Sequence, residues 1–258
     1  HPTGLEKHTQ NFGVDHNDFT WEAFENFVID TAKKDKDVTT KGIFAPWMLY
    51  KEDHLSIGGH DQRFTPYGYE DSDIFNRWIQ AGYEMIQSRD SLCYHMTCRG
   101  HRWNGGVGVE NSDYKETMGR CRREFLRKWG EWIQNDSYQY PIIHPKYDKG
   151  LIIKNCNEQF IEMLEPWFDT LYVDCDYKNY IEKESKRTIT DLFDRIKPYD
   201  NEKQNNILVS IDATNFNQQD YILLNQLAAI IQDSGQIGEF ELGNLKIDII
   251  NMREYLVN

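Results

Sequence analysis

Apolar residues recur at helical spacing just after a glycine-rich stretch, and the pattern predicts a helix that starts at Asp71 or Ser72 and ends at Gly82. Shorter apolar runs predict a strand at 83–86 and an extended segment at 92–96. The apolar positions of the predicted helix are Ile74, Phe75, Trp78 and Ile79. Helical spacing also predicts a helix over 115–130 and another that begins near Trp21.

Beyond about residue 140 the pattern changes to that of a small α/β unit. The stretch 140–150 contains two prolines and little periodicity, which predicts a linker. After it, the pattern predicts helices at 157–164, 178–196 and 218–233, and strands at 171–174, 207–212, 239–242 and 246–250. The last two strands flank Gly243-Asn244, a dipeptide typical of hairpin turns.

Composition narrows the class of protein. The chain has 258 residues, 39% of them hydrophobic and 14% aromatic, which is enough for a core in one large or two small domains. A net charge of −13 argues against nucleic acid as a partner and against anionic membrane surfaces. No apolar run reaches the roughly 18 residues of a membrane span. Five cysteines without metal-type spacing indicate reduced thiols and predict a cytoplasmic location.

The main candidate functional residues lie between Ile57 and Trp78. A Gly58-Gly59 turn and a Tyr67-Gly68-Tyr69 step precede the Glu70-Asp71 pair, which stands where the predicted helix begins. Glycine suits a backbone that approaches a ligand closely, and a helix N-terminus favours ionised carboxylates. The pair is therefore a candidate base for a bound ligand. A purely structural role as helix-capping residues is equally compatible with the pair alone.

The order of these motifs resembles the second half of a GT-A glycosyltransferase catalytic domain. The resemblance is to family 2 enzymes and to the C-terminal part of the galactosyltransferase domain, and it covers roughly residues 42 to 130. It rests on Gly58-Gly59-His60-Asp61, Phe64, the stretch from Tyr67 to Asp73, Arg77, and Ala81-Gly82-Tyr83. In those families the carboxylate pair contacts the acceptor sugar, and a histidine about twenty-five residues later binds the metal that holds the donor diphosphate.

The resemblance implies residue roles. Asp71 is the expected general base and Glu70 the residue that orients the acceptor, with the reverse assignment left open. His95, twenty-five positions after Glu70, is the expected ligand of Mn²⁺ or Mg²⁺, and His101 is a weaker candidate. The implied reaction transfers a sugar with inversion from a nucleotide-sugar donor to a glycan hydroxyl. Gly58, Gly59, Tyr67, Gly68 and Tyr69 are the candidate acceptor-binding residues.

A basic, glycine-rich stretch follows His95. Its Arg99, His101, Arg102 and Trp103 are candidate donor-loop residues, because arginine offers forked donors to phosphate. An ordinary surface loop explains the same composition equally well. The helix at 115–130 is also basic, and we expect most of its arginines to form a solvated face. Trp47 is a candidate sugar-stacking residue, although core packing explains it better.

The part of the GT-A domain that this sequence resembles does not include the nucleotide-binding first half of the fold or its Asp-x-Asp motif. The sequence therefore predicts a fragment: residues 1–140 form the acceptor-side half of a GT-A domain, and residues 141–258 form a small α/β accessory domain. The accessory domain is expected to serve packing, self-association or acceptor placement. Asp174, Asp176 and Asp212 are interpreted as structural residues at strand ends. The rival hypothesis is a non-catalytic, carbohydrate-binding or scaffolding remnant of such an enzyme. A second rival, a metal-dependent hydrolase, needs more clustered metal ligands than this sequence offers.

Overall fold

A computed structural model describes residues 7–43, 46–96, 102–103 and 109–257 as two compact units. The first unit contains residues up to Asp61, Glu70–Gly119 and Ile133–Ile142. The second contains Gln62–Tyr69, Arg120–Trp132 and Ile143–Asn258. Each unit therefore combines segments that are separate in sequence, whereas the pattern analysis placed a single boundary at residue 140.

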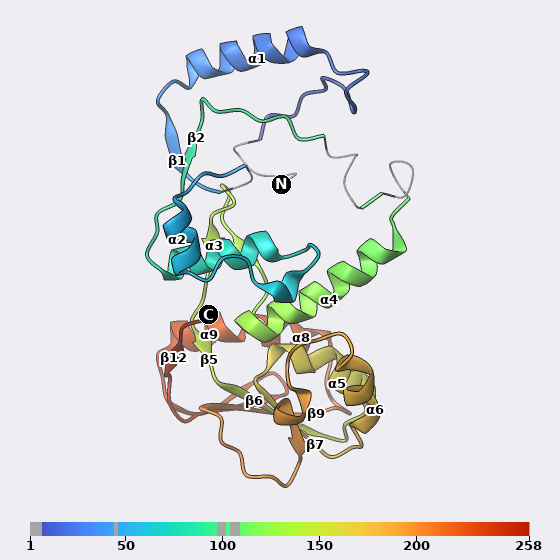
Figure 1. Cartoon of the computed structure of the whole chain (residues 1–258). Coiled ribbons are helices and arrows are strands. Elements are labelled where there is room, and N and C mark those ends of the chain that lie inside the picture. Colours follow the sequence, from blue (N-terminus) through green and yellow to red (C-terminus); the bar gives the residue numbers. More distant parts are fainter. Residues whose placement is uncertain (1–6, 44–45, 97–101, 104–108, 258) are drawn as a thin grey trace. The chain divides into compact units, whose positions relative to one another are not determined.

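The first unit is mainly helical. Its described helices are α1 (Trp21–Lys34), α2 (Lys51–Ser56), α3 (Glu70–Gln80) and the first part of α4 (Ser112–Trp129) (Figure 1). Strand β1 (Thr39–Lys41) pairs antiparallel with β2 (Ile86–Ser88), and β3 (Gln134–Asn135) pairs antiparallel with β4 (Pro141–Ile142). The helix predicted from Asp71 or Ser72 to Gly82 is confirmed as α3. The strand predicted at 83–86 is instead β2, which begins at Ile86.

Two apolar clusters hold the first unit together. One buries the inner face of α3 with neighbouring residues: Ile43, Ile74, Phe75, Trp78 and Met85. The other gathers the rings of Phe12, Phe19, Phe24, Phe27 and Tyr94 around the start of α1. In that cluster the Tyr94 hydroxyl donates to the Gly13 carbonyl at 2.8 Å and accepts from the Phe12 amide at 3.2 Å.

The second unit is built on a six-stranded sheet in the order β10-β11-β9-β6-β7-β8 (Figure 1). Strands β6, β7, β8 and β9 are parallel to one another, and the hairpin β10–β11 is antiparallel to β9. The strand bounds are β6 (Lys149–Lys154), β7 (Thr170–Val173), β8 (Ile196–Pro198), β9 (Ile207–Asp212), β10 (Gly238–Leu242) and β11 (Leu245–Ile249). A separate pair joins β5 (Lys146–Tyr147) to β12 (Glu254–Tyr255).

Helix α5 (Glu158–Leu164) and the 3₁₀ turn η2 (Glu165–Trp167) connect β6 to β7, and helices α6 (Lys178–Glu184) and α7 (Leu192–Arg195) connect β7 to β8. Helices α8 (Gln218–Asn225) and α9 (Leu227–Ser234) connect β9 to β10, and the 3₁₀ turn η1 (Gln62–Phe64) precedes the sheet in sequence. Side chains from the sheet and helices form one large core that includes Leu151, Ile161, Leu171, Val209 and Leu224. The mixed α/β class is confirmed, and the arrangement is consistent with an α/β glycosyltransferase-like fold.

Some predicted elements differ from those observed. The linker predicted at 140–150 contains the start of β6, a central strand whose Lys149 and Gly150 are buried. The helix predicted at 178–196 is two shorter helices followed by β8, and the helix predicted at 218–233 is divided at Gln226. The strand at 207–212 and the hairpin around Gly243 are confirmed.

The prediction that most arginines of α4 form a solvated face is wrong, because Arg127 is buried, Arg120 and Arg123 are half-buried, and Arg122 is exposed. Arg127 and Lys128 are both 4% exposed. The Arg127 guanidinium contacts the carboxylates of Glu165, Glu184 and Glu124, each at a closest distance of 2.6 Å. Buried charges persist where they are paired and hydrogen-bonded, so this half of α4 is anchored by an ionic network within the second unit.

Candidate functional site

The Gly58-Gly59 turn is fixed to α3 by a single buried arginine. Both glycines have positive φ, 86° and 66°, which favours glycine over other residues. The Arg77 guanidinium donates to the carbonyls of Ile57 and Gly59, each at 2.6 Å, and its Nε lies 2.9 Å from Oδ2 of Asp73. The sequence therefore supplies both the turn and the side chain that holds it against α3.

Glu70 and Asp71 occupy the first turn of α3. Asp71 is exposed to solvent and Glu70 is half-buried. Partial loss of hydration raises the pKa of the Asp71 carboxyl, the neighbouring charge of Glu70 raises that pKa further, and His60 opposes the increase. A raised pKa makes the ionised carboxylate a stronger base, which is the direction that general-base catalysis favours.

A group of rings lies beside the glycine turn. The Trp47 ring is 6.2 Å from that of His54 and 6.1 Å from that of His60, and the two imidazoles are 5.4 Å apart. Trp47 also contacts the buried Trp78 edge-on at 5.0 Å, so its packing role is clear. His54 Nδ1 is buried and meets no hydrogen-bond partner among the described residues. Pattern analysis overlooked His54, because a histidine on a short helix carries no motif.

The remaining acceptor candidates belong to the second unit. Gly68 and Tyr69 both have positive φ, 103° and 70°. The Tyr69 ring packs against Phe125 and Trp132, with centroid distances of 5.9 and 5.4 Å. The Cys121 thiol donates to the Tyr67 carbonyl at 3.4 Å. These contacts fix the Tyr67–Tyr69 step, and acceptor binding by it stays a prediction.

Two of the four predicted donor-loop residues, Arg99 and His101, lie outside the described residues. Arg102 donates to Glu110 from Nε at 2.8 Å, and its guanidinium lies 4.7 Å above the Trp103 ring. Trp103 pairs with Glu110 as an isolated antiparallel bridge. The role of these four residues with a donor stays a prediction.

The predicted metal ligand, His95, is exposed. Across residues 7–43, 46–96, 102–103 and 109–257, no three or more His, Cys, Asp or Glu side chains are grouped to hold a metal ion. His95 as a ligand of Mn²⁺ or Mg²⁺ therefore stays a prediction.

The strand order of the sheet reverses between β6 and β9, because the connection after β6 leads to β7 on one side and the connection after β9 leads to β10 on the other. In doubly wound folds ligands bind at such a point, outside the carboxyl ends of the strands. Here the backbone amides of Asn155 and Cys156 donate to the Asp174 carboxylate at 2.7 and 2.8 Å, and the Asn155 side chain donates to Asp212 at 2.9 Å. These bonds support the structural interpretation of both aspartates.

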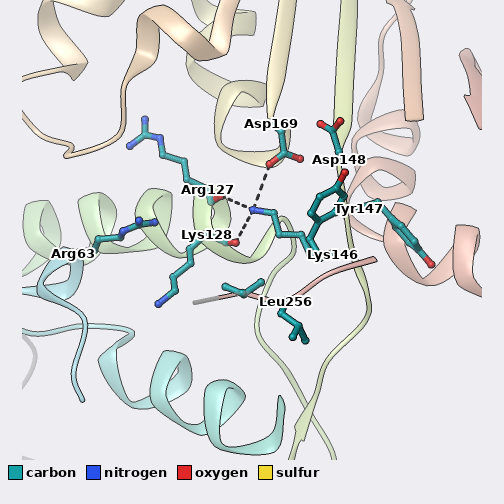
Figure 2. Close-up of a pocket in the computed structure, with 10 residues that line it drawn as sticks. Arg63, Arg127, Lys128, Lys146, Tyr147, Asp148, Asp169 and Leu256 are labelled. Carbon is teal, nitrogen blue, oxygen red and sulfur yellow. Dashed lines mark hydrogen bonds and ion pairs between the residues drawn. The ribbon is translucent and has the colours of Figure 1, made fainter. Parts of the chain in front are cut away.

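An open cavity of about 480 Å³ lies within the second unit (Figure 2). At its centre the Lys146 ammonium donates to the carbonyls of Arg127 and Lys128 at 3.3 and 2.8 Å, and lies 3.4 Å from the Asp169 carboxylate. None of the residues predicted for the catalytic, acceptor or donor site lines this cavity.

Comparison with known proteins identifies one segment. Residues 31–101 match the family model described as the N-terminal domain of galactosyltransferase. This segment is therefore similar to a glycosyltransferase region, and more particularly to a galactosyltransferase one. It contains the glycine turn, Glu70, Asp71 and His95, and ends just before Arg102. No curated protein and no solved structure matches the chain significantly.

No helix in the part of the chain that the structure describes combines the length and apolar character needed to cross a bilayer.

Proposed function

We propose that this chain carries the acceptor side of a glycosyltransferase that moves a sugar from a nucleotide-sugar donor to a glycan hydroxyl. The observation that carries the proposal is the Asp71 carboxyl. It lies inside the galactosyltransferase-like segment, at the start of α3, and both partial burial and Glu70 raise its pKa. A carboxylate with these properties suits removal of a proton from a hydroxyl group.

In the proposed reaction Asp71 accepts the proton of the acceptor hydroxyl as its oxygen attacks the anomeric carbon of the donor. The bond from that carbon to the nucleoside diphosphate breaks, and the diphosphate leaves with the bonding electrons. Attack from the face opposite the leaving group inverts the anomeric configuration. Glu70 is proposed to orient the acceptor by accepting a hydrogen bond from a second hydroxyl.

The glycine turn supports this role through Arg77. Its hydrogen bonds hold the Ile57 and Gly59 carbonyls, so the glycine turn is fixed to α3, the helix that begins with the carboxylate pair. Pre-positioned groups reduce the entropic cost of bringing reactants together. Tyr67, Gly68 and Tyr69 are proposed acceptor contacts, and Arg99, His101, Arg102 and Trp103 proposed donor contacts.

Dependence on Mn²⁺ or Mg²⁺ is part of the proposal, because galactosyltransferase-like domains commonly use a divalent metal. Such an ion would stabilise the departing diphosphate. The described residues provide no cluster of ligands for it, and the role assigned to Asp71 rests on the surroundings of that carboxyl. Membership of family 2, a place in polysaccharide synthesis, self-association and a cytoplasmic location are likewise proposals.

The test is a transfer assay with a panel of nucleotide sugars and oligosaccharides, comparing Asp71→Asn with the unmodified chain. Loss of a general base should lower kcat by roughly 10²- to 10⁴-fold. Asp30→Asn, on an exposed position of α1, is the matched control and should retain activity. Normal turnover by Asp71→Asn would eliminate the base assignment. Glycan binding without transfer for any donor, with or without Mn²⁺, would favour the carbohydrate-binding alternative.

A further inference from the structure

Two thiols lie together at the carboxyl edge of the parallel sheet in the second unit. Cys156 follows β6 and Cys175 follows β7, two strands that pair in parallel with Ile153 opposite Val173. Each thiol affects the pKa of the other. Both side chains are half-buried, and both pack against the core of the unit.

The local backbone favours a bond between these sulfurs. The Cys156 amide donates to the carboxylate of Asp174, the residue directly before Cys175, at 2.8 Å. Neighbouring parallel strands lie about 4.8 Å apart. Disulfides span roughly 4.4 to 6.8 Å between Cα atoms, a range that includes this strand spacing. The thiols therefore need little backbone movement to become linked.

We propose that Cys156 and Cys175 are a redox modification site. A low-molecular-weight disulfide such as oxidised glutathione oxidises the two thiols, and the product is an intramolecular disulfide between them. One thiol loses its proton and attacks a glutathione sulfur, which releases one glutathione and leaves a mixed disulfide. The second thiol loses its proton and attacks the protein sulfur of that intermediate, which releases the second glutathione. The protein thiols are oxidised, and the glutathione disulfide is reduced to two thiols.

The surroundings of the pair make the reaction slow but selective. Burial raises the pKa of both thiols, and the nearby Asp174 carboxylate raises both further. Because the thiolate is the attacking form, few molecules are reactive at neutral pH. The partner thiol lies at the end of the neighbouring strand, however, so closure of the mixed disulfide competes well with its reversal. An exposed thiol such as Cys93 can stop at the mixed disulfide.

The new bond would join the turn between β6 and α5 to the turn between β7 and α6. Cross-linking positions 156 and 175 restricts the unfolded chain, and a closed loop of this size raises the midpoint of thermal unfolding by roughly 5 to 10 °C. The modification would fix the carboxyl edge of the sheet between β6 and β7. This position is next to β9, where the strand order of the sheet reverses.

The test equilibrates the full chain in glutathione buffers from reducing to oxidising, blocks free thiols by alkylation, and maps peptides by mass spectrometry. The expected product is one peptide pair joined through Cys156 and Cys175, with a higher thermal midpoint. Cys156→Ser and Cys175→Ser should each abolish the linked peptide and the thermal shift, whereas Cys93→Ser should retain both.

Two results would overturn the proposal. One is that both thiols remain alkylatable, or carry only glutathione, under the most oxidising buffer. The other is that the joined peptides contain a different cysteine pair. The serine variants remove only the sulfur of half-buried residues, and circular dichroism under reducing conditions establishes that each is folded. If both serine variants fail to fold, mapping of the unmodified chain alone decides between the outcomes.

Discussion

Arg77 and Asp73 form a buried ion pair one helical turn apart on α3, with Nε of Arg77 2.9 Å from Oδ2 of Asp73. The side chains are 6% and 0% exposed. The same guanidinium holds the Gly58-Gly59 turn through two carbonyls. One side chain thus couples the conformation of the turn to the helix that begins with the candidate catalytic pair.

Substitution of Arg77 by lysine should destabilise the first unit. An ammonium lacks the planar fork that serves a carboxylate and two carbonyls together, so buried acceptors lose their donors. We expect the free energy of unfolding to fall by roughly 3 kcal/mol, as for other broken buried pairs. Urea denaturation followed by tryptophan fluorescence measures this. The control is Lys41→Gln, which removes an exposed pair with Glu84; an equally small change in both variants would contradict the prediction.

The pH dependence of transfer should follow the charges around Asp71. A general base works when ionised, so activity falls as the pH drops through its pKa. Because Glu70 raises that pKa, Glu70→Gln should move the acid limb of kcat/KM to lower pH. His60 lowers the same pKa, so His60→Gln should move the limb to higher pH. Shifts in the same direction for both variants would exclude Asp71 as the group that titrates.

Much of the fold could be predicted because local sequence determines it. Helix α3 follows from its apolar spacing, and the β10–β11 hairpin follows from Gly243-Asn244. Strand β6 could not be predicted, because its short apolar run directly follows a proline-rich stretch and its partners β7 and β9 are distant in sequence. A pattern of residues does not reveal pairing that depends on tertiary contacts.

In the candidate site, too, some features follow from local sequence and others depend on tertiary contacts. Glu70 and Asp71 could be selected from their chemistry and from their place at a helix start. The action of Arg77 could not, since its acceptors are backbone carbonyls 18 and 20 positions away, and a carbonyl has no residue-type signal. The ionic role of Arg127 was likewise hidden, because a basic helix is ordinarily solvated.

The buried Glu165 carboxylate should make the second unit sensitive to acid. Arg195 and Arg127 lower its pKa to about 2, against 4.5 for an ordinary glutamate. The resulting stabilisation is complete above pH 4.5 and is lost as the pH falls from there towards 2. It is worth about 3 kcal/mol, from 1.36 kcal/mol for each pKa unit.

Glu165→Gln tests this coupling. This substitution removes the carboxylate charge that the buried arginines share. We therefore expect the free energy of unfolding to fall by roughly 3 to 5 kcal/mol at pH 7. The difference in unfolding free energy between the variant and the unmodified chain should shrink as the pH approaches 3, where the unmodified chain also becomes less stable. Urea midpoints at several pH values measure both effects. Glu162→Gln, at an exposed position of α5, should behave like the unmodified chain; a pH-independent difference for Glu165→Gln would contradict the assigned pKa.

Gly150 in β6 tests how tightly the sheet is packed. A Cβ atom there would lie 2.4 Å from Oδ1 of Asn205, which is closer than contacting atoms allow. The amide of Asn205 has little freedom to move, because it accepts from the Tyr172 hydroxyl at 2.9 Å and donates to Asp148 at 2.6 Å. Gly150→Ala should therefore cost about 1 to 3 kcal/mol through overpacking and disrupted hydrogen bonds.

The matched control for that substitution is Gly119→Ala. Gly119 lies within α4, and an added Cβ would meet nothing within 4 Å, so alanine should raise stability by up to about 1 kcal/mol. Chemical denaturation of the two variants gives effects of opposite sign. In an Asn205→Ala background the cost of Gly150→Ala should shrink, because the clashing amide is gone. An unchanged cost in that background would show that the strain arises elsewhere in the strand.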